Sequence, residues 1–224
     1  MKKMVLLSLL FLFVVGACWA NYSDVRSSII ELKVGKEGGA GVVIEDDGDY
    51  LYILTCEHAF QKKKTMAVQI RDIDWNKTVI DIYPENVRKH PLIDLAIIRV
   101  ERPIGVYKVA PMAVSEPVIG DPVSIIGHPM NFHYTLSEGI VSNYPIKRIR
   151  KNQDVELMMI SAPAIGGNSG GPVFNDRWEV VGIVSGIMYY EEGWLLGSDT
   201  EFVHFMTFIV PLSQIEEFLD DVEW

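Results

Sequence analysis

A glycine-rich stretch around one serine is the strongest chemical signal in this sequence. Residues 166–172 read Gly-Gly-Asn-Ser-Gly-Gly-Pro, which places Ser169 in a tight turn. Glycine accepts the left-handed backbone conformation that points successive N–H groups into one pocket. Such amides stabilise the oxyanion that forms when a hydroxyl attacks a carbonyl, by about 3–4 kcal/mol each. The stretch predicts a nucleophilic Ser169 with the amides of Gly167 and Ser169 as its oxyanion hole; the alternative is a glycine turn between strands.

Two further residues are suitable acid–base partners for this serine. His58 follows the apolar run 51–54, and Asp94 precedes the apolar run 95–98. A carboxylate buried at such a position is costly unless it is paired. A neutral histidine that donates to Asp94 satisfies both groups and holds the tautomer that accepts the proton of Ser169. The order His58, Asp94, Ser169 therefore predicts a catalytic triad, although each residue taken singly also fits a structural role.

The serine motif also fits the G-x-S-x-G nucleophile elbow of α/β-hydrolases. That elbow requires a helix after the serine, then an acid and a histidine later in the chain. Residues 172–174 and 179–187 are β-like instead, and His204 is the only histidine after Ser169. The remaining chain is too short to complete a doubly wound sheet, so the sequence excludes this alternative.

Short strand-like runs separated by turn signals must position the three residues. They predict an all-β fold of two antiparallel six-stranded β-barrels with a short C-terminal helix. The first barrel, residues 21–102, carries His58 and Asp94, and the second, residues 117–212, carries Ser169. A proline-containing linker over 103–116 joins them. A helix over 213–224 follows, with Ser213 as its N-cap and Glu216 completing a capping box.

Three blocks, Leu54–His58, Asp94–Ile97 and Gly167–Pro172, resemble the signature segments of trypsin/chymotrypsin-clan serine peptidases. The stretches 125–129 and 137–142 are similar to the HtrA (Deg) branch. The resemblance implies a trypsin-like double barrel with its active site between the barrels. It further implies His58 as general base and acid, Asp94 as the residue that orients it, and Ser169 as nucleophile.

The sequence departs from relatives of this clan in two places. Asn168 stands where animal trypsins carry the aspartate that pairs with a new N-terminus, so we expect no zymogen switch of that kind. The chain also ends soon after the second barrel, so we expect no PDZ domain. The resemblance implies that substrate lies along the strand near Ser185, whose hydroxyl supports the triad carboxylate. The implied substrate-binding residues contain no acid, which favours small or medium aliphatic P1 residues over Lys or Arg; they are Ala162, Pro163, Ala164, Ser185, Gly186 and Ile187.

The N-terminus has the residue pattern of an export signal. Lys2 and Lys3 precede the apolar run 4–19, which is short for a membrane span of about 20 residues. A cleaved signal peptide over 1–20 fits this pattern, with a retained anchor as the alternative. Residues 15–18, Val-Gly-Ala-Cys, also resemble a bacterial lipobox. We expect an exported protein, periplasmic or extracellular, that contacts a membrane only if Cys18 is lipidated.

Charge and composition exclude several function classes. The net charge of −10 and the scarcity of basic clusters argue against a nucleic-acid partner. No cluster of His, Cys and carboxylates has metal-ligand spacing, so we expect no metal and no cofactor. After loss of the signal peptide Cys56 is the only cysteine, so no internal disulfide is expected.

The resulting hypothesis is an exported serine endopeptidase that hydrolyses polypeptides through an acyl-enzyme intermediate. Its rate should rise with pH as His58 loses a proton, from an ordinary pKa near 6.5. One alternative is a catalytically idle barrel that acts as a protein-binding module. Another is an esterase or self-processing enzyme on the same fold.

Overall fold

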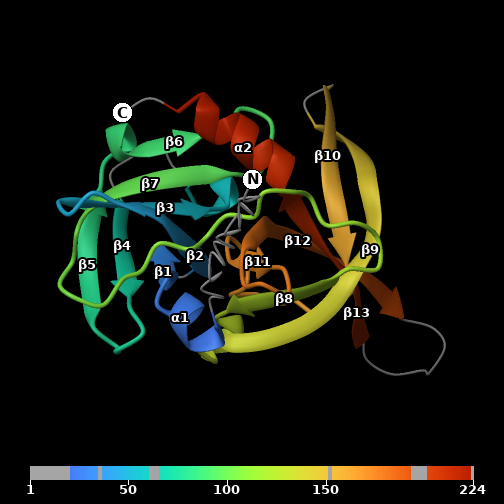
Figure 1. The fold of residues 1–224 in the computed structure, drawn as a ribbon, viewed down its shortest axis with the longest axis horizontal. Helices are drawn as coiled ribbons and strands as arrows, with labels where there is room; N and C mark the ends of the chain where they lie inside the picture. The colour runs from blue at the N-terminus through green and yellow to red at the C-terminus, as the bar shows by residue number, and fades with distance from the viewer. Residues whose placement is uncertain (1–20, 35–36, 61–65, 151–152, 193–200, 223–224) are drawn as a thin grey trace, which may run out of the picture.

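The computed structural model describes residues 21–34, 37–60, 66–150, 153–192 and 201–222. The expected signal peptide, including Cys18, lies outside these residues. Two antiparallel sheets lie side by side, one built from the first half of the chain and one from the second (Figure 1). This confirms the predicted all-β class with two sheets.

The N-terminal half begins with a short helix, α1 (Tyr22–Arg26), and forms a seven-stranded sheet in the order β5-β4-β1-β2-β3-β7-β6. The sequence predicted a six-stranded barrel here, whereas the described strands form a curled, open sheet with β5 and β6 at its edges. The additional strand is β6, a three-residue segment whose composition carries no strand signal and which pairs with β7. The strands are β1 (Ile29–Val34), β2 (Glu37–Asp46), β3 (Tyr50–Thr55), β4 (Met66–Arg71), β5 (Lys77–Ile82), β6 (Val87–Lys89) and β7 (Ala96–Glu101). Along the chain, the 3₁₀ turn η1 (Glu57–Phe60) lies between β3 and β4, and η2 (Pro84–Asn86) lies between β5 and β6.

The C-terminal half forms the closed six-stranded barrel that the sequence predicted, in the order β10-β13-β12-β11-β8-β9. Closure pairs every strand on both sides and leaves no free sheet edge. The 3₁₀ turn η3 (Pro129–Asn131) lies between the first two strands of the barrel. The strands are β8 (Pro122–Gly127), β9 (Thr135–Arg150), β10 (Gln153–Ile160), β11 (Pro172–Phe174), β12 (Val180–Glu192) and β13 (Glu201–Pro211).

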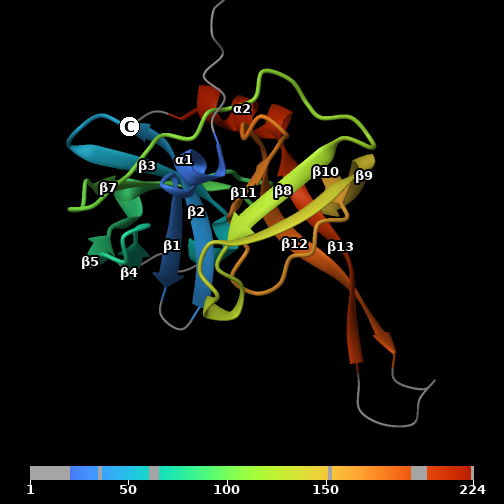
Figure 2. The same cartoon turned by 60° about the horizontal axis from the view of Figure 1, so that its bottom comes forward.

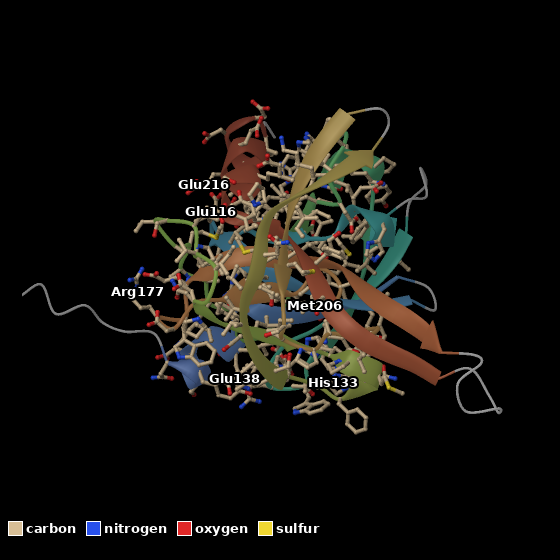
Figure 3. All side chains as sticks on the ribbon, turned by 90° about the vertical axis from the view of Figure 1, so that its right-hand side faces the viewer. Glu116, His133, Glu138, Arg177, Met206 and Glu216 are labelled. Carbon is tan, nitrogen blue, oxygen red and sulfur yellow. The ribbon has the colours of Figure 1, made fainter. Side chains whose placement is uncertain are left out.

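The C-terminal helix α2 spans Leu212–Asp220, and it begins differently from the predicted capping box. Its N-cap is Pro211, which makes no side-chain capping bond, and Ser213 lies inside the first turn. The amide of Ser213 donates to Oε1 of Glu116 at 2.7 Å, and Figure 3 shows Glu116 next to this helix. An acceptor from the linker therefore caps the helix, which no local pattern could indicate.

One hydrophobic core joins the two sheets. Leu54 and Ile97 from the first sheet pack in the same cluster as Ile126 and Phe174 from the barrel, and all four are 2% exposed or less. Strands β1 and β2 lie against β8 and β11 (Figure 2). Because packed interiors resist deformation, this shared core holds the facing ends of the two sheets in one fixed relation.

Candidate active site

His58 and Asp94 meet at one edge of the first sheet. His58 lies in η1 directly after β3, and Asp94 lies two residues before β7. Strands β3 and β7 are antiparallel neighbours, with Thr55 opposite Ala96, so the end of one meets the start of the other. Nδ1 of His58 lies 2.8 Å from Oδ2 of Asp94, and the His58 amide donates to Oδ1 at 2.9 Å. Both carboxylate oxygens thus hold the histidine in one orientation.

Asp94 receives a further donor from the other sheet. Oγ of Ser185 in β12 donates to Oδ2 at 2.8 Å. The turn before Asp94 is held by His90, whose Nδ1 accepts from the amides of Leu92 and Ile93 at 3.1 and 2.8 Å. Burial by itself would raise the pKa of Asp94, but the hydrogen bonds and positive charge of His58 outweigh it and hold that pKa below its ordinary value. Asp94 is therefore an ionised carboxylate at neutral pH.

Ser169 lies in the β10–β11 connection of the barrel, which contacts both sheets. Its carbonyl accepts from the amide of Ala40 in β2 at 2.9 Å, and the next amide, of Gly170, donates to Val184 in β12 at 2.8 Å. Gly170 has φ +78°, and a Cβ there would lie 2.2 Å from Oγ1 of Thr55 and 2.4 Å from the carbonyl oxygen of Ala40. Only glycine fits this turn, which explains the sequence pattern around the serine.

Two amides of the turn are left for a ligand. The amides of Asn168 and Gly171 are used internally, donating to Ile165 and Asn168 at 3.0 and 2.9 Å. In the described part of the chain, the amides of Gly167 and Ser169 have no acceptor. Gly167 adopts φ +106°, the left-handed conformation that the glycine pattern anticipated. These are the two N–H groups that the sequence proposed as an oxyanion hole.

His58, Gly167 and Ser169 line one cleft of about 700 Å³. The hydrogen bond that would complete the triad is not formed: within the described residues, Nε2 of His58 contacts Sγ of Cys56 at 3.6 Å and not Oγ of Ser169. Cys56 is buried at 1% exposure. The sequence analysis named Cys56 only as a free cysteine and did not assign it to the site. Its position two residues before His58, at a strand end, was a usable signal for this contact. Nε2 of His58 therefore has two candidate partners, Sγ of Cys56 and Oγ of Ser169.

The electrostatics of His58 differ from the expectation. The hydrogen bond to Asp94, followed by the contact with Cys56, raises the pKa of His58 well above its ordinary 6.5. Burial lowers it by less. The expectation of an ordinary value near 6.5 was therefore too low for this imidazole, because that expectation ignored the carboxylate at 2.8 Å.

The predicted substrate-binding residues are not brought together in the described cleft. Ala162 and Ala164 are 0% and 1% exposed and pack in the core of the barrel. The carbonyl of Pro163 accepts from Oγ of Ser137 at 2.7 Å. Ser185 contacts Asp94 as described, Gly186 is half-buried, and the side chain of Ile187 lies outside the described residues.

The cleft is instead lined by residues that the sequence analysis did not single out or had assigned to structural roles. They come from the β1–β2 hairpin and from the loop that contains η3. His128 is one of them: it is 3% exposed, and burial lowers its pKa to about 3, so its imidazole stays neutral. The lining from these two segments is Glu31, Lys33, Gly38, Gly39, His128, Met130 and Asn131.

The described ranges contain neither a metal-ligand cluster nor a membrane-spanning helix. No group of three or more His, Cys, Asp or Glu residues there could hold a metal ion. Over the same ranges, no helix is long and apolar enough to cross a membrane.

Known proteins resemble this chain in sequence and in fold. "Serine protease HtrA-like" from Staphylococcus aureus strain USA300 is 28% identical over 214 residues, 91% of this chain but 26% of that protein. The protein of the same name from strain MRSA252 matches to the same extent. The chain thus spans about a quarter of the length of these relatives, and the expected absence of a PDZ domain stays a prediction.

Solved structures share the architecture. An inactive form of a Rv3671c mutant from M. tuberculosis H37Rv superposes with a TM-score of 0.69 at 17% identity, covering 89% of this chain and 88% of that one. The HtrA-type protease AlgW with tripeptide has a TM-score of 0.66 at 20% identity, covering 90% and 63%. At these identities the likeness concerns the fold. The family described as "Trypsin-like peptidase domain" matches residues 39–183, well over half of the chain. The chain therefore belongs to the trypsin-like peptidase domain family.

Proposed function

We propose that the protein is an exported serine endopeptidase that cleaves polypeptides through an acyl-enzyme intermediate. The observation that carries the proposal is the hydrogen bond between His58 and Asp94, with His58 lining the same cleft as Ser169 and two unused amides. Membership of the trypsin-like peptidase domain family supports it.

In this mechanism Oγ of Ser169 attacks the carbonyl carbon of the scissile bond while Nε2 of His58 accepts its proton. The amides of Gly167 and Ser169 donate to the oxyanion of the tetrahedral intermediate. His58 then gives the proton to the leaving amine, the C–N bond breaks, and the acyl group stays on Ser169. Water, deprotonated by His58, attacks the ester and releases the acid. Asp94 stays ionised and holds the protonated imidazole in place.

The first step requires His58 to exchange one partner for another. Nε2 contacts Sγ of Cys56, so it must turn toward Oγ of Ser169 when substrate binds. Catalytic hydrogen bonds are often long or misaligned in unliganded enzymes and tighten in the substrate complex. Nδ1 and the His58 amide can both stay bonded to Asp94 while Nε2 changes its partner.

The contact between His58 and Cys56 also favours a second candidate. A barrel that keeps its general base away from Ser169 would bind proteins without cleaving them. A fluorophosphonate probe separates the two, because it reacts only with an activated serine. We expect the wild type to be labelled and Ser169→Ala not to be. Ser115→Ala is the control, since that exposed serine lies in the linker away from the cleft.

Absence of labelling in folded wild type would favour the protein-binding alternative. Peptide and ester substrates of matched sequence, with products identified by mass spectrometry, separate an endopeptidase from an esterase. An N-terminus beyond Asn21 in wild type that is absent from Ser169→Ala would identify self-processing. The P1 preference for small or medium aliphatic residues is read from the same digest, where dominant cleavage after Arg or Phe would overturn it.

Export rests on the pattern of residues 2–19 alone. Mass spectrometry of the mature N-terminus tests it. A start at Asn21 indicates a general signal peptidase, and a lipid-modified Cys18 indicates an anchored protein.

A further inference from the structure

A charged network that the proposed chemistry does not use borders the cleft. Glu31 and Lys33 lie two residues apart in β1 and so on the same face of the strand. Nζ of Lys33 lies 3.1 Å from Oε1 of Glu31, and Nε of Arg71 lies 3.1 Å from Oε2. The Glu31 side chain is 2% exposed, whereas that of Lys33 is 31% exposed and lines the cleft. Two cations therefore share one buried carboxylate, and the network is net positive.

The neighbouring histidines do not change this charge. Nη1 of Arg71 lies 2.9 Å from Nε2 of His133, and because arginine can only donate, that nitrogen accepts. Burial lowers the pKa of His133, and that of His128, whose ring centroid lies 5.5 Å away, is also lowered. Figure 3 shows His133 at the edge of the molecule beside the start of β9. Both imidazoles are thus neutral at physiological pH.

The network lies on the side of Ser169 that the leaving group should occupy. The acyl side of a substrate is expected along β12, whose Ser185 and Val184 contact Asp94 and Gly170. On the opposite side, the β1–β2 hairpin contributes Gly38 and Gly39 to the cleft beside Lys33. A Cβ at Gly39 would lie 2.9 Å from the carbonyl oxygen of Ser169, so this hairpin passes directly beside the nucleophile.

We propose that Lys33 forms a subsite for a carboxylate on the leaving-group side of the scissile bond. The carboxylate comes either from an Asp or Glu side chain or from a free C-terminus of the leaving peptide. Glu31 is a positioning residue that holds the lysine at the cleft, and Arg71 offsets the charge of Glu31. The protein has a net charge of −10, so its surface as a whole repels acidic substrates. A positive charge at the cleft would therefore favour binding of acidic substrates at that place. This inference rests on the proposed peptidase function.

The test uses the whole protein and quenched-fluorescent peptides that share one sequence before the scissile bond. The first two residues after the bond carry Glu, Gln or Lys, and each peptide is made with an amidated and with a free C-terminus. We expect kcat/KM about five- to tenfold higher for Glu than for Gln, a ratio set by one partly exposed charge-assisted hydrogen bond. Added salt should reduce the ratio. A gain confined to short peptides with free C-termini would identify the terminal carboxylate as the source.

Variants assign the preference to the lysine. Lys33→Met should abolish the Glu preference and Lys33→Glu should invert it in favour of Lys. Lys33→Arg keeps the charge and should keep the preference. Lys108→Met is the matched control, since that lysine is 53% exposed and pairs with Asp24 outside the cleft. Thermal unfolding verifies that each variant is folded.

The outcomes separate this inference from the proposed function. Cleavage of none of the peptides by folded wild type would overturn the peptidase proposal itself. Equal rates for Glu and Gln, together with equal rates for amidated and free C-termini, would overturn the subsite alone, and this comparison needs only the wild-type protein. A Glu preference that survives in Lys33→Met would move the subsite to another residue and equally refute the assignment to Lys33.

Discussion

Replacement of Gly167 by alanine should disable one of the two amides proposed for the oxyanion. Gly167 adopts φ +106°, where an L-residue is strained. The added Cβ would lie 2.2 Å from the carbonyl oxygen of His128 and 3.1 Å from Cα of Pro129. Both neighbours are backbone atoms, so no side chain can move aside. The 166–168 turn must shift, and the amide of Gly167 shifts with it.

The substitution has two free-energy costs, one that lowers stability and one that raises the reaction barrier. A left-handed conformation costs an L-residue about 1–2 kcal/mol, which lowers the free energy of unfolding. Loss of one oxyanion donor raises the barrier by about 3–4 kcal/mol, so kcat should fall by about 10²–10³. KM should change little, because the oxyanion exists in the transition state and not in bound substrate.

Gly120→Ala is the matched control. Gly120 adopts φ +99°, but a Cβ there would meet nothing within 4 Å, and the residue lies outside the cleft. It carries the same backbone strain without the overlap. Its free energy of unfolding should fall by the strain alone, about 1–2 kcal/mol, whereas its kcat should equal that of wild type. The assay is kcat and KM on one peptide, with urea unfolding of each protein. Wild-type kcat in folded Gly167→Ala would refute the role of this amide.

Four further changes test the rest of the site and its support. Asp94→Asn should lower the pKa of His58 and reduce kcat by about 10⁴, as loss of the orienting carboxylate does in related triads; unchanged steady-state turnover would contradict the pairing. Cys56→Ala removes a contact that raises the pKa of His58. Because the neutral imidazole is the base, the rising limb of kcat/KM against pH should move to lower pH. An unmoved limb would show that the thiol does not affect the pKa of His58. Ser185→Ala should lower kcat/KM about tenfold by removing one donor to the ionised carboxylate, and a stability loss without this change would make the serine structural. Phe174→Ala should lower the free energy of unfolding by about 3–5 kcal/mol in urea titrations, since Phe174 is fully buried in the core shared by the sheets.

The sequence by itself determined the turn chemistry around Ser169 and the positions of His58 and Asp94 at strand ends. These are local patterns. Glycines around Ser169 indicate a tight turn, in which Gly170 indeed adopts φ +78°, and an apolar run that stops at a polar residue indicates a strand end. The same alternation of runs and turns predicted an all-β fold and a closed second barrel. Such signals are readable because strand period and turn geometry involve residues a few positions apart.

Only the tertiary structure decided which groups meet across the sheets. Glu116 caps the helix at Ser213 from 97 residues away, and Lys33 reaches the cleft because β1 lies against the barrel. The raised pKa of His58 depends on the distance to Asp94, which a sequence does not contain. The physical reason is that sheet curvature and register, set by packing of the whole core, determine these separations. Residue spacing along the chain constrains local conformation but leaves such long-range distances undetermined.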